Sequence, residues 1–282
     1  FGNLTSFNPI SNVAGIFSMS DIVLDSQNNL LYCGLFASGA ATVSFFSGNV
    51  SGCLFRLNSQ TGQRDAWTPI ASNTAANILK LILDKTNNLL YVGGSWLSTL
   101  SVGGSTGTAG LACLTANPAN TTSTRIATFS HVLNNSIRDM SLDIVNNKLY
   151  IVGTFTTINP NATGSVTRNR IACLDLLATG SSALTGWNPN ASSDVYQIIK
   201  SGDWLYVAGS FNTLNGCMTR GIARLHANEN VNMIDINWLF TSTTSVSVKN
   251  IGIYDEYLYV FGNVFDLNSV ATRHICRLKT RA

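Results

Sequence analysis

The sequence has 282 residues, of which 45% are hydrophobic but only 11% are charged, against roughly 25% in ordinary soluble domains. The net charge of +3 is too small to indicate a nucleic-acid partner, and no apolar stretch approaches the ~18 residues of a membrane-spanning helix. The polar surface is built instead from 31 Asn and from 58 Ser and Thr residues, which leaves little charge repulsion between copies and favours secretion, glycosylation or self-association.

One phrase recurs along the chain and predicts a strand that follows a tight turn. In chain order it reads "NNLLYCGLF" (28–36), "LLYVGGSW" (89–96), "NNKLYIVGTF" (146–155), "GDWLYVAGSF" (202–211) and "DEYLYVFGNVF" (255–265). Asn-Asn or Gly-Asp supplies the backbone conformations of the turn, and the glycine allows a bulge or a close backbone approach. Apolar stretches such as "ILKLILD" (78–84) and "VYQIIK" (195–200) precede the phrase and predict its partner strand.

Two further phrases follow and complete a predicted unit of four short strands. The third-strand phrase reads "CLFRLNSQTG" (53–62), "LACLTANP" (111–118), "IACLDLLATG" (171–180), "IARLHANEN" (222–230) and "ICRLK" (275–279). The fourth reads "AWTP" (66–69), "ATFS" (127–130), "GWNP" (186–189) and "NWLF" (237–240). Four antiparallel strands repeated with a period of 50–60 residues are typical of propeller blades.

We therefore predict an all-β fold, a single five-bladed β-propeller of four-stranded antiparallel blades that covers residues 1–282. The blades are expected at about 10–69, 70–130, 131–190, 191–240, and 241–282 together with 1–9. These five ranges are called repeats one to five below.

The N-terminal residues resemble the strand that the last repeat lacks. The fifth unit stops after "HICRLKTRA" (274–282), and "FGNLTSFNP" (1–9) matches the fourth phrase, with Phe7 in the place of Trp187. The N-terminal strand is thus expected to complete the last blade. It either closes the ring within one chain or completes a neighbour's blade, which would produce a filament.

The order of these phrases resembles that of kelch-type and, more closely, delta-60-type propeller repeats. The segments "LYVGGSW" (90–96) and "LYVAGSF" (205–211), each followed by an "IARL"-like strand, carry the likeness over essentially the whole chain. The unit is longer than a kelch repeat, and the double glycine is kept only at Gly93–Gly94. The resemblance implies a propeller, and it implies no particular function.

The aromatic residues of the repeated phrases are expected to pack between neighbouring sheets, because a single blade cannot bury both of its faces. This packing set comprises Tyr32, Tyr91, Tyr150, Tyr206, Tyr259, Trp67 and Trp187.

No set of residues predicts catalysis. Asp25, Asp84 and Asp143 sit beside the Asn-Asn turns and are expected to accept backbone N–H bonds there. Asp21 and Asp139 lie in the first strand of their repeats and are the only basis for an alternative glycosidase with carboxylates in a central channel. Repeats four and five offer no matching acid, apart from the displaced Asp194.

We expect no metal and no cofactor. The three histidines fall at unrelated places in the repeat, and the six cysteines have no zinc-ligand spacing. An even number of cysteines permits disulfides in an oxidising compartment, and the other interpretation is that several are small core residues.

Six asparagines have the N-glycosylation motif, a number that chance also predicts in a sequence so rich in Asn, Ser and Thr. They are Asn3, Asn49, Asn120, Asn134, Asn161 and Asn190.

The function favoured by the sequence is that of a secreted, glycosylated, non-enzymatic structural or surface protein that assembles with itself into a filament or layer. The expected partners are further copies of the chain and glycans, with no nucleic acid and no membrane span. The alternatives are a multivalent carbohydrate-binding propeller and, less favoured, the channel glycosidase.

Overall fold

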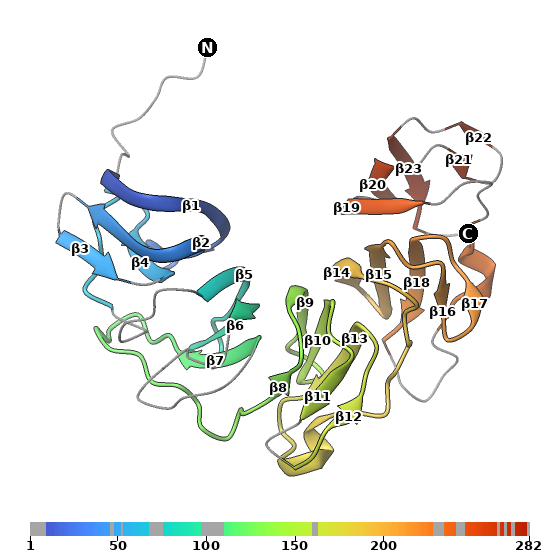
Figure 1. Ribbon diagram of the computed structural model, residues 1–282, viewed down its shortest axis with the longest axis horizontal. Helices are drawn as coiled ribbons and strands as arrows, with labels where there is room; N and C mark the ends of the chain where they lie inside the picture. Colours follow the sequence, from blue (N-terminus) through green and yellow to red (C-terminus); the bar gives the residue numbers. More distant parts are fainter. Residues whose placement is uncertain are drawn as a thin grey trace. The chain divides into compact units, whose positions relative to one another are not determined.

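The computed structural model describes residues 10–45, 48–51, 53–67, 76–96, 110–159, 163–227, 234–240, 246–263, 266–267, 270–271 and 274–280. The chain divides into two compact units, Phe1–Ser136 and Ile137–Ala282. Figure 1 labels the strands of both units. The prediction that residues 1–9 complete the last repeat lies outside the described residues.

Each repeat contains an antiparallel sheet in which the strand of the "LYxxG" phrase is central (Figure 1). The strands are β1 (Ile10–Asp25), β2 (Leu30–Phe45) and β4 (Leu54–Asn58); β5 (Ala76–Asp84), β6 (Leu89–Trp96) and β7 (Leu111–Thr115); β9 (Ile137–Asp143), β10 (Lys148–Gly153) and β13 (Ile171–Asp175); β14 (Val195–Ser201), β15 (Trp204–Gly209) and β18 (Ile222–His226); β19 (Ser247–Tyr254), β20 (Tyr257–Asn263) and β23 (Ile275–Lys279).

Small hairpins occupy the connections between the second and third strands in several repeats. They are formed by β3 (Gly48–Ser51) on the end of β2, by β11 (Thr157–Asn159) with β12 (Val166–Thr167), by β16 (Thr213–Leu214) with β17 (Cys217–Met218), and by β21 (Asp266–Leu267) with β22 (Val270–Ala271). The remaining elements are β8 (Val132–Leu133) and the 3₁₀ turns η2 (Gly180–Ala183) and η3 (Ile236–Trp238). Among the described residues, no helix is long and apolar enough to cross a membrane.

The predicted fourth strand is reduced to a single bridge in each of the first four repeats, so this part of the prediction is wrong for the described residues. The bridges are Leu57–Arg64, Leu114–Arg125, Leu174–Leu184 and Leu225–Ile234. Side chains compete with the ladder here: Asp65 accepts the backbone N–H of Trp67, and Asp235 accepts that of Asn237. Such local side-chain bonds take backbone N–H groups that a strand ladder would use, so the pairing stops after one bridge.

The turns between the first two strands confirm the role predicted for their aspartates. Asp84 accepts the backbone N–H groups of Thr86 and Asn87, and the Asn87 side chain bonds the same carboxylate. Asp25 and Asp143 accept matching bonds in their own turns. The last turn residue has positive φ, 54° at Asn29, 52° at Asn88 and 52° at Asn147, which asparagine tolerates better than most residues.

Apolar clusters join successive repeats within each unit. In unit 1, one cluster joins β2 and β4 to β5, β6 and β7. In unit 2, one cluster joins repeats three and four, and another joins repeats four and five. Repeats one, three and four therefore each bury a face against the next repeat of the same unit, which a single sheet cannot do alone.

The glycine that ends the "LYxxG" phrase is required by a close backbone approach. A Cβ built on Gly209 would lie 2.2 Å from the carbonyl oxygen of Asp194, and one on Gly262 would lie 2.2 Å from that of Ser247. The register of the strand pair shifts at this point, between Val195 and Gln197 in repeat four. At this bulge, the backbone of the central strand lies directly against the backbone of the residue before the first strand, which is Asp194 in repeat four.

Gly209→Ala should destabilise the protein by about 1–3 kcal/mol, because the added methyl group forces the bulge apart. The midpoint of urea denaturation measures the effect. Gly252→Ala is the matched control, since a Cβ on Gly252 meets nothing within 4 Å. Equal midpoints for the two variants would contradict the close-approach explanation.

His131 is the most deeply buried of the three histidines, with 2% of its surface exposed, and it stands edge-on to Phe129 at 4.5 Å between ring centroids. Burial lowers the pKa of its imidazole from 6.5 to about 4. The folded state therefore holds this side chain neutral at pH values where the unfolded chain would protonate it.

Stability should fall as the pH falls from about 6.5 to about 4, because the unfolded state binds more protons than the folded state in this window. The loss should be on the order of 3 kcal/mol at most. Urea denaturation at several pH values measures it, and His131→Phe should flatten the slope. An unchanged slope in that variant would assign the pH dependence to other groups.

Candidate functional site

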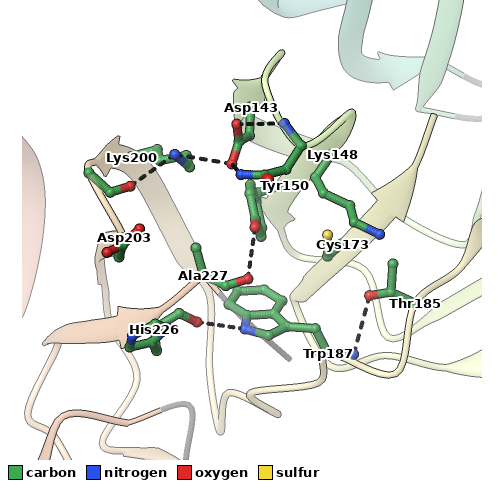
Figure 2. A pocket seen from close by; sticks show the side chains of 12 residues that line it. Asp143, Lys148, Tyr150, Cys173, Thr185, Trp187, Lys200, Asp203, His226 and Ala227 are labelled. Carbon is green, nitrogen blue, oxygen red and sulfur yellow. Dashed lines mark hydrogen bonds and ion pairs between the residues drawn. The ribbon is translucent and has the colours of Figure 1, made fainter. Parts of the chain in front are cut away.

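A groove between repeats three and four, both in unit 2, forms a cavity of about 430 Å³ (Figure 2). Its wall combines the turn after β9, the central strand β10, the third strand β13 and the turn that follows β14. The lining residues are Asp143, Asn146, Lys148, Tyr150, Cys173, Thr185, Trp187, Lys200, Gly202, Asp203, His226 and Ala227.

Two aromatic side chains form the back of this groove. The rings of Tyr150 and Trp187 lie 5.2 Å apart at an interplanar angle of 73°. The hydroxyl of Tyr150 donates to the carbonyl oxygen of Ala227 at 2.9 Å, and the indole N–H of Trp187 donates to that of His226 at 3.0 Å. Figure 2 shows both bonds reaching from repeat three to the end of β18. The polar ends of the two rings are thus held in place by the neighbouring repeat.

Ion pairs stand at the rim of the groove. Lys200 Nζ lies 3.0 Å from a carboxylate oxygen of Asp143, and Lys148 Nζ lies 2.8 Å from one of Asp175. Burial alone would raise the pKa of the Asp143 carboxyl, but hydrogen bonds from Asn146 and Lys200 outweigh it and lower the pKa. Asp143 is therefore an ionised structural acceptor and is poorly suited to be a general acid.

The equivalent groove between repeats four and five has a cavity of about 720 Å³ and a more acidic rim, with Asp203, Asp255 and Glu256 in its lining. Here Arg224 lines the groove, at the position of Cys173 in repeat three. Grooves thus recur at equivalent places, but their walls differ in chemistry.

Sequence reasoning missed these arginines, although a signal was present. Each tyrosine of the central strand pairs across the sheet with one residue of the third strand, and that residue is Arg56, Cys113, Cys173, Arg224 or Arg277. The alternation of arginine and cysteine in the "IARL"-like phrase is visible in the sequence alone.

The aromatic residues predicted to pack between sheets differ in how deeply they are buried. Tyr32, Tyr91, Tyr150, Tyr206, Trp67 and Trp187 are each at most 3% exposed, and Tyr259 is half-buried. Tyr32 stands edge-on to Trp67, Tyr91 to Phe129, and Tyr206 to Trp238, with centroids 5.3, 5.6 and 5.4 Å apart.

The two aspartates behind the glycosidase alternative are bonded to the backbone of the next repeat. A carboxylate oxygen of Asp21 accepts the N–H of Leu81 at 2.7 Å, and one of Asp139 accepts the N–H of Ile198 at 2.9 Å. Gln197 holds the same position in repeat four and accepts the N–H of Ile251. In these three repeats the position thus holds a hydrogen-bond acceptor, whether charged or neutral, whereas repeat two has Lys80 there.

Asp139→Asn should leave stability nearly unchanged, because the amide oxygen still accepts the Ile198 N–H, whereas Asp139→Ala should cost about 1–3 kcal/mol by leaving that N–H unpaired. Thermal denaturation of both variants measures the difference. A large loss in the Asn variant would show that the charge itself is needed.

Of the asparagines with the glycosylation motif, Asn120, Asn134 and Asn190 are exposed, while Asn49 lies in β3. Asn3 and Asn161 lie outside the described residues. Within the described residues, no group of three His, Cys, Asp or Glu side chains is arranged to hold a metal. All six cysteines lie in this part of the chain, and none of them is in a disulfide.

No protein-family model matches this sequence, and no curated protein matches it. Among solved structures, the chain is similar to that of U3-55K, with a TM-score of 0.53, 10% identity, and coverage of 98% of this chain and 66% of that chain. Two structures with TM-scores of 0.49 are the RRP9 WD40 repeats (8% identity, 96% and 85% coverage) and the computationally designed Ika8 protein (11% identity, 93% and 71% coverage).

These likenesses concern the fold alone. Together with the series of small antiparallel sheets, the likeness to U3-55K supports a β-propeller. The number of blades and the kelch or delta-60 type of the repeat remain predictions.

Proposed function

We propose that this protein is a non-enzymatic structural protein that assembles head to tail with copies of itself. One observation carries the proposal: the first and fifth repeats expose faces that the other repeats bury. An extracellular filament or layer, built from glycosylated chains, is the assembly that the composition favours.

The exposed face of repeat one lies on β1. Met19 is 46% exposed and Ile22 is 53% exposed. The equivalent residues of repeats two, four and five are at most 2% exposed: Ile78, Leu81, Val195, Ile198, Val248 and Ile251. Leu24, 52% exposed, extends the apolar area on the same face of the sheet. Apolar side chains gathered in this way mark an interaction surface.

The exposed face of repeat five lies on β20 and β23. Ile275 is 55% exposed, whereas the equivalent Leu54, Ile171 and Ile222 are at most 2% exposed. Phe261 beside it is 41% exposed. The third strand of repeat five therefore exposes an apolar side chain that the other repeats named bury.

The two faces are the two halves of one recurring contact. In repeats one, three and four, the central tyrosine donates its hydroxyl proton to a carbonyl just after the third strand of the next repeat, at Ala116, Ala227 and Thr280 respectively. Tyr259 occupies this position in repeat five, and Ser59 carries the equivalent carbonyl in repeat one. Across two copies, Tyr259 is expected to donate to Ser59.

The hydrogen bond from a backbone N–H to a side chain of the first strand can also form between two copies. Asn250 is exposed and holds the position that Asp21, Asp139 and Gln197 hold in other repeats, so its amide oxygen can accept the N–H of Ile22 in the next copy. A second copy of the chain thus carries the surface complementary to each end. Contacts of this head-to-tail type extend into filaments when they do not close.

Ile22→Glu and Ile275→Glu should each weaken self-association roughly 100-fold, because each puts an unpaired charge into one half of the contact. Light scattering over a range of concentrations and electron microscopy measure the assembly. An equimolar mixture of the two variants should form dimers and stop there, since each retains one intact face.

Val145→Glu is the matched control, because Val145 is 84% exposed in a turn away from both faces. Wild-type chains that remain monomeric at every concentration would overturn the proposal. That result would favour a chain that covers both of its end faces itself.

One observation favours the second candidate, a multivalent carbohydrate-binding protein. Grooves recur at equivalent places between successive repeats, and the first has aromatic rings with amide and carboxylate groups at its rim. Binding of the protein to a glycan array tests this candidate function, and the absence of binding to any glycan would exclude it.

A further inference from the structure

The arginine of repeat one fills the space between the aromatic rings and the next repeat. Arg56 is 1% exposed, its guanidinium carbon lies 5.8 Å and 5.5 Å from the ring centroids of Tyr32 and Trp67, and it pairs with Asp65 at 2.7 Å. It also donates to the carbonyl oxygen of Asn120 at 3.0 Å in the next repeat. The guanidinium group thus joins ring faces, a carboxylate and a backbone carbonyl.

The arginine of repeat four has an equivalent environment. Arg224 is 6% exposed, pairs with Asp235, and donates to the carbonyl oxygen of Thr280 in repeat five. Its guanidinium carbon lies 4.5 Å from the ring centroid of Trp204 and 5.5 Å from that of Trp238. Two repeats, in different units, therefore each hold a buried arginine among two aromatic rings, a carboxylate and a backbone carbonyl, but only repeat one uses the tyrosine of its central strand for this.

Repeat three keeps the frame of this site without its arginine. Tyr150 and Trp187 stand where Tyr32 and Trp67 contact Arg56 in repeat one. The Ala227 carbonyl corresponds to that of Thr280 in repeat four, whereas Lys148 takes the position of Trp204.

Two shorter residues replace the ion pair of repeat four. Cys173 takes the position of Arg224 and Thr185 takes that of Asp235, and both line the cavity (Figure 2). The cavity of about 430 Å³ therefore lies where the other two repeats place a guanidinium group.

The charges around the cavity permit a cation to enter. Lys200 and Lys148 line it, but both are paired, with Asp143 and with Asp175. Asp203 adds an exposed carboxylate at the rim. A cation bound here could contact the ring faces of Tyr150 and Trp187, the Asp203 carboxylate, and the second lone pair of the Ala227 carbonyl oxygen.

We propose that the groove between repeats three and four binds the guanidinium group of an arginine side chain from a partner peptide or protein, in place of the arginine that repeats one and four supply themselves. Guanidinium fits better than ammonium, because it is planar, stacks on aromatic faces and is weakly hydrated. The site uses none of the residues of the two end faces, so a negative result at this site would leave the self-assembly proposal standing.

The test uses N-acetyl-L-argininamide as the probe and N-acetyl-L-citrullinamide, its uncharged counterpart of nearly the same shape, as the comparison. Binding is followed in the full chain by the NMR shift of the Trp187 indole N–H, assigned with Trp187→Phe. We expect the arginine probe to bind at least tenfold more tightly than the citrulline probe. Equal binding of the two probes, or no shift at Trp187, would overturn the proposal.

The variant Cys173→Arg/Thr185→Asp rebuilds the internal pair and should abolish binding of the probe, while Cys173→Ala, the matched control, should retain it. Binding by the rebuilt variant would place the probe elsewhere and refute the site. Should that variant fail to fold, Asp203→Asn serves instead, because Asp203 is exposed in a turn. It should weaken the arginine probe severalfold and leave the citrulline probe unchanged, and equal effects on both probes would count against the proposal.

Discussion

The structure depends on one contact that recurs within the two units, between repeats one and two, three and four, and four and five. A tyrosine hydroxyl donates to a carbonyl after the third strand of the next repeat, and an acceptor on the first strand takes a backbone N–H from the next first strand. Apolar residues fill the space between these two bonds. Because each sheet of these pairs buries its apolar face against its neighbour, the contact contributes to the stability of each unit.

Two positions of this contact differ in residue type from repeat to repeat, and such positions can acquire a function without loss of the contact. The acceptor position tolerates Asp21, Asp139 or Gln197, because only an oxygen is needed there. The third-strand position tolerates more, since either a buried arginine with its aspartate or a cysteine can stand beside the same tyrosine. The first choice fills this position with an internal ion pair, and the second leaves it unfilled beside an aromatic wall; both grooves have a cavity.

The sequence predicted well those features that depend on neighbouring residues. The strands around the "LYxxG" phrase, the Asn-Asn turns and their capping aspartates follow from local backbone preferences, and the structure has them. The fourth strand was predicted from its repetition alone. It is reduced to a bridge because Asp65 and Asp235 bond their own backbone, a local competition that strand patterns do not reveal.

The sequence by itself determined that this chain is a series of similar β-sheets with a nearly uncharged surface, because period, turn chemistry and composition are properties of the chain order. Only the tertiary structure decided which repeats bury their faces, what Asp139 bonds, and that Cys173 borders a cavity. These contacts join residues far apart in sequence, 77 positions for Tyr150 and Ala227, and they depend on how sheets pack rather than on how each strand forms.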